Sequence, residues 1–140
     1  MDVLPVHFIQ GLLTFGNLWA IVLGTFVGLI IGTIPGMGTM IAIVLLLPLT
    51  YFMDPVPSIL LLLSAYQASE YGGSISAIIL GIPGIPAAAA TVLDGSTLAR
   101  SRSPGKALGY SLYAGFFGGI VGGLALIFLS APLTRFALKV

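Results

Sequence analysis

Long apolar runs, separated by short stretches rich in glycine, proline and serine, make up most of this chain. Apolar residues dominate residues 18–34, 41–47 and 107–133. A helix needs roughly 20 residues to cross a bilayer, so the first and last runs predict membrane-spanning helices. Trp19, near the start of the first run, fits an aromatic anchor at the membrane interface.

The stretches between these runs are more mixed. Residues 1–16 predict an interfacial segment, in which His7 has no neighbouring residues that could complete a metal site. Residues 59–63 form a third apolar run, which is either extended through residue 66 or a half-helix. Residues 74–93 form a fourth segment that Pro83 interrupts.

Charged residues help to orient these segments. Residues 94–106 are the clearest hydrophilic loop, and the basic side chains in it place the loop in the cytoplasm by the positive-inside rule. Asp54, which lies between prolines and the end of an apolar run, is expected in a turn at the membrane surface. No basic stretch precedes the first run as in a signal peptide, so we expect that run to be retained.

The composition sets the class of protein. The chain has 140 residues, of which 58% are hydrophobic and 6% charged, whereas soluble domains carry about a quarter charged residues. We therefore predict an all-α fold over residues 1–140: a polytopic membrane helical bundle with interrupted or re-entrant helices, forming part of a transmembrane domain.

Several function classes are disfavoured by the residues present. A net charge of +1 argues against a nucleic-acid partner, which needs a basic face. The absence of cysteine excludes disulfides and thiolate metal sites. No catalytic triad, zinc-protease motif or phosphate-binding loop is found. We expect no enzyme, no metal site and no cofactor, apart from a coupling ion that is either a proton or sodium.

Two Pro-Gly pairs stand inside apolar sequence. Pro35 and Gly36, followed by Gly38, end the first run, and Pro83 and Gly84 break the fourth segment. A helix broken at membrane depth leaves backbone groups without water, so such breaks persist where protein buries them or where they line a wet cavity. Paired interruptions point to a transport site. A simple turn at the membrane surface is an equally open interpretation.

Small hydroxyl side chains accompany both breaks. Thr39 follows the first break, and Ser74, Ser76 and Thr91 flank the second. A helix that restarts after a break presents free N–H groups and a positive dipole end, which suit a carboxylate ligand. These residues are therefore candidates for binding a small organic acid.

Two acidic residues are candidates for ion coupling. Glu70 lies next to the glycine-rich sequence at residues 71–73, which is expected to interrupt the helix. An acidic group at membrane depth is costly and usually functional, whereas at the interface it is only a solvated end residue. Asp94 is either a turn residue or part of the anion site.

Glycines recur every fourth residue in two of the runs. The two sets are Gly24, Gly28, Gly32 and Gly36, and Gly115, Gly119 and Gly123. This spacing places each set on one face of a helix and favours close packing against another helix. The alternative is a smooth surface along which one bundle slides. Either way, the chain is expected to have partner helices, in itself or in another subunit.

Ordered motifs in this sequence resemble those of a known family. Residues 28–38 and the apolar stretch that ends in Pro48 look like the start of a permease. The stronger match runs from Tyr71-Gly72-Gly73-Ser74 through Pro83-Gly84 to Asp94-Gly95, and residues 105–109 continue it. Together they resemble the TctA family, the large permease subunit of tripartite tricarboxylate transporters.

The resemblance implies a multi-pass permease of a bacterial or archaeal inner membrane. Its partners would be a small membrane subunit and an extracytoplasmic solute-binding protein, and ion-driven uptake would carry tricarboxylates or related organic acids. The family's signature positions that this sequence matches are Pro35, Gly36, Tyr71, Gly72, Gly73, Ser74, Pro83, Gly84, Thr91 and Asp94.

Two departures from the family pattern bear on function. The family's permeases are several times longer, so the resemblance implies an N-terminal fragment or a split subunit. Glu70 stands where an uncharged residue is expected, which leaves the coupling ion and the substrate class open. The competing hypothesis is a structural or assembly membrane protein whose glycine faces only pack helices.

The sequence thus gives three sets of expected site residues. The broken-helix residues are Pro35, Gly36 and Gly38, and the ion-coupling candidates are Glu70 and Asp94. The expected substrate-binding residues are Thr39, Tyr71, Gly72, Gly73, Ser74, Ser76, Pro83, Gly84 and Thr91.

Overall fold

The computed structural model describes residues 14–138, apart from the side chains at positions 131 and 136, and this part of the chain is helical without strands. The all-α prediction is therefore confirmed. Residues 1–13, including His7 and most of the expected interfacial segment, lie outside the described residues. The elements in chain order are α2 (Phe15–Thr33), α3 (Gly38–Thr50), α4 (Pro55–Leu80), the 3₁₀ helix η1 (Pro86–Ala88), α5 (Ala89–Ser101) and α6 (Pro104–Ala137).

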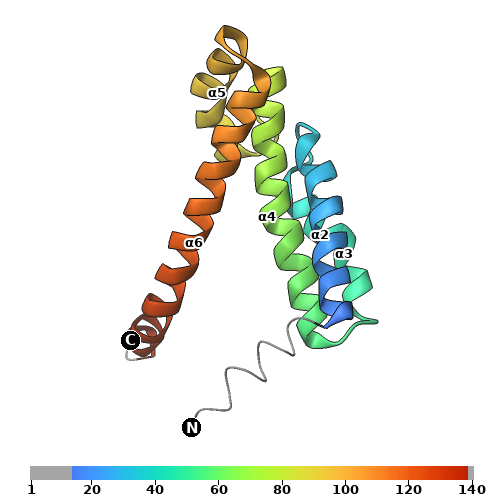
Figure 1. The fold of residues 1–140 in the computed structure, drawn as a ribbon. Helices are drawn as coiled ribbons and strands as arrows, with labels where there is room; N and C mark the ends of the chain where they lie inside the picture. The colour runs from blue at the N-terminus through green and yellow to red at the C-terminus, as the bar shows by residue number, and fades with distance from the viewer. Residues whose placement is uncertain (1–13, 139–140) are drawn as a thin grey trace.

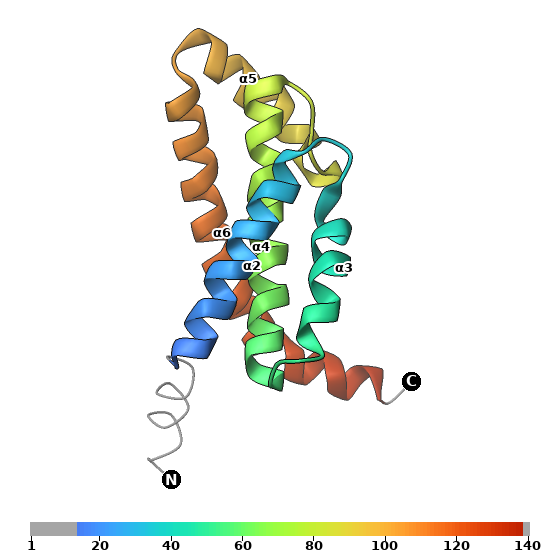
Figure 2. The same ribbon diagram turned by 90° about the vertical axis from the view of Figure 1, so that its right-hand side faces the viewer.

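The helices are arranged around α4. Helices α2 and α4 run in the same direction, and α3 runs back beside them from a turn part-way along α4 (Figure 2). After α4 the chain turns back to η1, and α5 then leads to α6, which runs back toward the other end. Helix α6 diverges from α4, so the two form an inverted V joined near α5 (Figure 1).

Two helices of the described chain are long and apolar enough to cross a membrane. They are α2 and the Pro104–Arg135 portion of α6. Helix α3 has 13 residues and is about 20 Å long at 1.5 Å per residue, which is too short for a hydrocarbon layer of about 30 Å. The connection between α2 and α3, residues 34–37, is therefore expected to lie within the bundle, and we call it the tip.

Glycines allow α2 to lie directly on α4. A Cβ atom added at Gly28 would overlap the Ala65 carbonyl oxygen, and one at Gly32 would overlap that of Ser69. Gly24 stands against Leu61 in the same way, one turn earlier. Both sets of positions advance by four residues, so the contact follows one face of each helix. The packing prediction is confirmed for these three glycines, because only a residue without a side chain permits this approach.

The fourth glycine of that set has a different role. Gly36 lies beyond the end of α2, with open space where a Cβ would stand, so its predicted place on the helix face is wrong. Helix α2 ends because Pro35 follows Ile34, whose extended conformation does not continue a helix. For the glycines of α6 from Gly115 to Gly123, no packed partner is found within the described residues beyond Gln67, which lies 3.6 Å from a Cβ placed at Gly119.

Helix α4 is continuous where the sequence predicted an interruption. It runs from Pro55 to Leu80 and includes Gly72 and Gly73, both of which are buried. Glycine weakens a helix by about 1 kcal/mol relative to alanine, and burial against neighbouring segments can offset this. The predicted boundaries near residues 59–66 and 74 are therefore wrong. Asp54 has an extended conformation and is the residue immediately before the helix, in the connection from α3.

The predicted hydrophilic loop at residues 94–106 is largely helical. Residues up to Ser101 belong to α5, and α6 begins at Pro104, so the connection is short. The charged side chains of this region lie on helix surfaces and at helix ends, which is compatible with helical backbone.

Helix α4 ends at Gly81, whose φ of 70° is the left-handed conformation that commonly terminates helices.

The first break is a tight turn. The Met37 N–H donates to the Ile34 carbonyl at 3.2 Å, with Pro35 and Gly36 as the central residues. Proline at the first central position and a glycine with φ of 88° at the second are the features of a type II turn. The turn reverses the chain into α3, so the turn interpretation of this break is correct in its local geometry.

Replacing Gly36 with alanine should destabilise the turn, although the space around it is open. The cost arises from the left-handed φ and should be about 1–2 kcal/mol, measured as the free energy of unfolding in detergent with a denaturing surfactant. Gly36→Asn should recover part of this loss, because asparagine tolerates that conformation better. Equal losses for both variants would contradict the backbone explanation.

Candidate substrate and ion site

The two broken segments meet on the C-terminal half of α4. The Gly84 N–H donates to the Gly73 carbonyl oxygen at 3.3 Å. A Cβ added at Gly84 would lie 2.5 Å from the Gly32 carbonyl oxygen and 2.8 Å from the Gly73 Cα. The end of α2 and the second break therefore touch each other and α4 at one point. We call Gly32, Gly72, Gly73 and Gly84 the glycine junction.

The two glycines that α4 contributes to the junction contact different segments of the chain. A Cβ at Gly72 would lie 2.7 Å from the Leu29 carbonyl oxygen of α2. A Cβ at Gly73 would lie 2.5 Å from Cγ1 of Ile85, which is buried in the second break. Consecutive residues on a helix point in different directions, so the glycine pair opens two adjacent sides of α4. This explains why glycine occurs at both positions.

Ser76 contributes to the junction from inside α4. Its side chain is 2% exposed, and its hydroxyl donates to the Gly73 carbonyl oxygen at 3.0 Å. A Cβ at Gly84 would lie 2.6 Å from this hydroxyl oxygen. Ser76 thus lies against the second break, as its sequence position suggested, within packed protein.

A chain of hydrogen bonds connects the first break to α4. The Ser69 hydroxyl donates to Thr39 Oγ1 at 2.7 Å, and the Thr39 hydroxyl donates to Glu70 Oε1 at 2.7 Å. Ser69 is fully buried, and Glu70 and Thr39 are partly buried. Thr39 lies in the first turn of α3, so the carboxylate contacts the residue that follows the first break. The interpretation of Glu70 as a helix-end residue is wrong, because α4 continues on both sides of it.

Glu70 also lines a small cavity between α4, η1 and α6. The cavity has a volume of about 180 Å³. Its lining includes four residues with polar side chains, Gln67, Tyr71, Ser74 and Ser111. The Tyr71 hydroxyl also donates to the Leu108 carbonyl oxygen at 3.4 Å, which connects α4 to α6. A carboxylate with these neighbours has the donors and acceptors to hold a cation or water.

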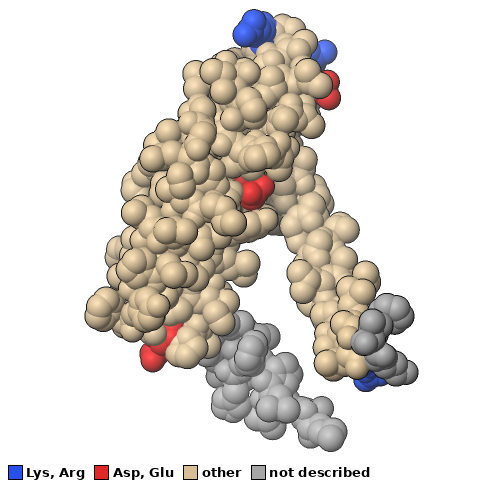
Figure 3. Space-filling view, turned by 180° about the vertical axis from the view of Figure 1, so that it is seen from behind, with Lys and Arg blue, Asp and Glu red and all other residues tan. Residues whose placement is uncertain are grey.

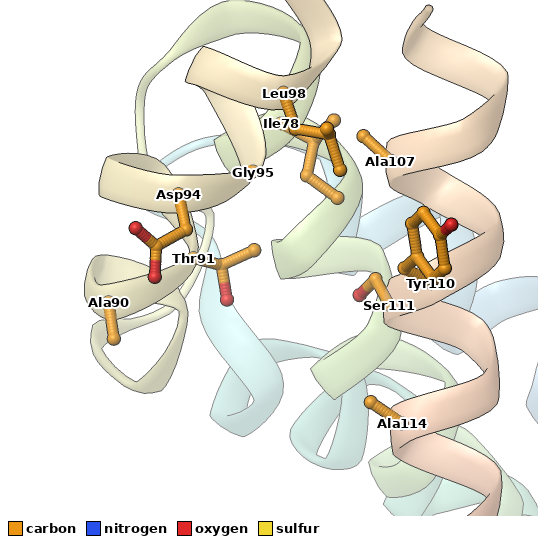
Figure 4. A pocket seen from close by; sticks show the side chains of 10 residues that line it. All are labelled: Ile78, Ala90, Thr91, Asp94, Gly95, Leu98, Ala107, Tyr110, Ser111 and Ala114. Carbon is orange, nitrogen blue, oxygen red and sulfur yellow. The ribbon is translucent and has the colours of Figure 1, made fainter. Parts of the chain in front are cut away.

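A larger cavity of about 400 Å³ lies between α5 and α6. Thr91 and Ser111 lie on opposite sides of it, and the Asp94 carboxylate points away from α6 (Figure 4). Ser111 lines both this cavity and the smaller one beside Glu70, so the two are neighbours. Organic ligands usually occupy pockets of about 300–1,000 Å³, a range that includes only the larger of these two cavities.

The structure divides the predicted site residues into groups. The residues at the glycine junction or the smaller cavity are Glu70, Tyr71, Gly72, Gly73, Ser74, Ser76 and Gly84, and Thr39 is hydrogen-bonded to Glu70. Thr91 and Asp94 line the larger cavity. Pro35, Gly36 and Pro83 are exposed at the turns, and Gly38 is partly exposed at the start of α3. Asp94 belongs to a different cavity from Glu70.

Sequence reasoning missed Ser69, Gln67 and Ser111. Ser69 precedes Glu70, and a partner for it on the far side of the first break could have been suspected. Ser111 lies on a helix whose approach to α4 depends on the whole fold, so no local pattern identifies it.

Basic side chains lie away from both cavities. Neither cavity has lysine or arginine in its described lining. Arg100, Arg102 and Lys106 flank the α5–α6 connection, and Arg135 is near the end of α6. On the face seen in Figure 3, basic atoms lie toward the ends of the molecule. Acidic atoms are also visible at the closed end of the hollow between the two arms of the inverted V. An anion in these cavities would rely on N–H and hydroxyl donors.

Comparisons with known proteins identify the family. The sequence model described as the tripartite tricarboxylate transporter TctA family matches residues 18–140. An Agrobacterium vitis protein, described as an uncharacterized 52.8 kDa protein in the TAR-I ttuC′ 3′ region, is 36% identical over 136 residues. That match covers 97% of this chain and 27% of the relative. No solved structure matches. With the family match extending over most of its length, the chain belongs to the tripartite tricarboxylate transporter TctA family.

Proposed function

We propose that this chain forms part of a permease that takes up tricarboxylates or related organic acids, driven by a proton or sodium gradient. The observation that carries the proposal is the meeting of two broken apolar segments on α4, beside Glu70. Broken helices at membrane depth serve as substrate and ion sites in secondary transporters. Membership of the TctA family supports the same substrate class.

The organic acid is assigned to the larger cavity. Thr91 and Ser111 supply hydroxyl donors there, and the volume of about 400 Å³ is suitable for a small organic ligand. Thr91 lies in the first turn of α5, which continues directly from η1, and the Ala89 N–H donates to the Pro86 carbonyl oxygen. The positive dipole end of the helix also favours a carboxylate here. The remaining predicted residues then act by shaping the junction and by holding the coupling ion.

The transporter would operate in a bacterial or archaeal inner membrane as a multi-pass protein. Its partners would be a small membrane subunit and an extracytoplasmic solute-binding protein that delivers the substrate, as the family assignment supports. The basic residues Arg100, Arg102 and Lys106 support a cytoplasmic α5–α6 connection by the positive-inside rule.

Glu70→Gln is expected to abolish the dependence of uptake on the coupling ion. The complete transporter should accumulate a labelled tricarboxylate when a proton or sodium gradient is imposed. The side-chain oxygen of glutamine can still accept the hydrogen bond from Thr39, but the charged group that would bind the cation is lost. Uptake should be measured over a series of pH values and sodium concentrations.

Asp54→Asn is the matched control, because Asp54 lies before the first turn of α4, far along the helix from Glu70. It should retain normal ion dependence. If the complete transporter accumulates no organic acid under either gradient, the proposed function is wrong. The structural alternative, supported by the tight α2–α4 packing, would then be favoured.

A further inference from the structure

The hydrogen bonds of Thr39 join a turn to a carboxylate. Thr39 accepts from the buried Ser69 hydroxyl and donates its own proton to Glu70 Oε1. It belongs to the first turn of α3, directly after the tip formed by Pro35 and Gly36. Nothing lies within 4 Å of a Cβ placed at Gly36 or Gly38, so the tip has open space around its backbone.

We propose that Thr39 is the positioning residue that couples cation loading at Glu70 to movement of the α2–α3 tip. The inference rests on the proposed function, because it describes how ion binding at that site acts. The ligand is a monovalent cation, either a proton or sodium, bound at the carboxylate. In the empty state Thr39 holds the start of α3 against α4; in the loaded state this attachment is weakened and the tip moves.

The strength of the attachment depends on the charge of Glu70. A hydrogen bond to an ionised acceptor is roughly twice as strong as one between neutral groups. Thr39 has a single hydroxyl proton, and it is directed at Glu70. Protonation of the carboxylate or its coordination of sodium removes the advantage of the charged acceptor. At the other end of α3, the Ser58 hydroxyl donates to the Asp54 carbonyl oxygen at 2.8 Å and lies 3.3 Å from the Thr50 carbonyl oxygen. These contacts do not involve Glu70, so α3 would pivot about that end.

The cavity beside Glu70 is suited to a cation. Its volume of about 180 Å³ is below the 300–1,000 Å³ typical of organic ligand sites but exceeds the roughly 30 Å³ that one water occupies in the liquid. Tyr71, Ser74 and Ser111, each of which carries a hydroxyl group, line it together with Glu70. Oxygen ligands of this kind are the ones that alkali cations and protonated water use.

Few other ionisable groups face Glu70. Helices α2 and α3 and the 3₁₀ helix η1 contain no ionisable side chain within their described bounds. Tyr71 of α4 lines the same cavity, and α6 contributes Ser111 and Gly115 to its lining. Asp94 of α5 lines the neighbouring cavity, and Tyr110 of α6 does so as well. Glu70 is therefore the acidic group of this cavity, and a cation response measured at the tip can be traced to it by substitution.

The test measures exposure of the tip by thiol labelling. The 140-residue sequence contains no cysteine, so Met37→Cys introduces a single reporter within it, at a position that is 40% exposed. The complete transporter is used, with any cysteines of other segments or subunits replaced. One arm raises sodium at constant pH, and the other lowers pH at constant sodium, so the two cations are distinguished.

With Thr39 intact, the effective cation should change the labelling rate by about fivefold or more, the lower end of typical coupling between two sites. Thr39→Val should give the loaded-state rate in every condition, whereas Thr39→Ser, which retains the hydroxyl, should restore the response. Glu70→Gln should be insensitive to both cations, and it serves the same purpose if Thr39→Val fails to fold.

An unchanged cation response in Thr39→Val would overturn the proposal, as would the absence of any response with Thr39 intact. Labelling does not depend on transport. Failure of uptake together with a normal labelling pattern would therefore contradict the proposed function alone. Normal uptake without a labelling response would contradict only the role of Thr39.

Discussion

Gly84→Val is expected to reduce organic-acid uptake by the complete transporter by about 100-fold, the loss that a misplacement of about 1 Å can cause at a reacting site. The valine Cβ would stand 2.5 Å from the Gly32 carbonyl oxygen and 2.8 Å from the Gly73 Cα. These are backbone atoms, so no side-chain rotation can relieve the overlap. The second break must then move away from α4 and from the end of α2.

Uptake of a labelled tricarboxylate and the amount of protein in the membrane should be measured together. Ile82→Val provides the matched control, because Ile82 lies in the same loop and is 54% exposed. It should transport normally. If Gly84→Val is inserted normally and transports at the normal rate, contact between the second break and the end of α2 is not needed for function.

Gly28→Ala is expected to lower the free energy of unfolding by about 1–3 kcal/mol, the usual cost of adding bulk to a well-packed contact. The new methyl group would overlap the Ala65 carbonyl oxygen, so α2 and α4 must separate. In a solvent-exposed helix the same substitution would be favourable by about 1 kcal/mol, so packing and helix propensity predict effects of opposite sign.

Gly16→Ala tests the two effects in one helix. Gly16 also belongs to α2, but nothing lies within 4 Å of a Cβ placed there. It should leave stability unchanged or raise it slightly. Unfolding with a denaturing surfactant, followed by circular dichroism, provides the measurement. Equal stability changes in Gly16→Ala and Gly28→Ala would show that the α2–α4 contact is not decisive.

The sequence was a good guide to the helices and a poorer guide to their limits. Periodic glycines predicted the buried face of α2, because close helix approach leaves a regular local pattern. The glycine pair in α4 was misread as a break. Local propensity favours that interpretation, and only the neighbours of Gly72 and Gly73 explain why the helix continues. Residues 94–101 were misread for a similar reason, since their polarity does not distinguish a loop from an exposed helix.

The candidate site also combines features that local sequence patterns predict with contacts that they do not predict. Thr39 and Glu70 were each selected from their own surroundings, but their hydrogen bond spans 31 positions in the sequence. Likewise, the two Pro-Gly breaks looked alike in sequence, yet one is a hydrogen-bonded turn and the other packs against Gly73. Contacts of this range depend on how α2, α3 and α4 are arranged, which local patterns do not contain.

Gly115 has a consequence for the wetting of Glu70. It lines both the cavity beside Glu70 and a third cavity, of about 420 Å³, between α4 and α6, and nothing lies within 4 Å of a Cβ placed there. A bulky residue at this position would therefore fill space in both cavities and reduce the volume open to water beside the carboxylate. Gly115 is not part of the glycine junction, so the junction would keep its contacts. The room for water around an acid on α4 thus depends on a glycine of α6.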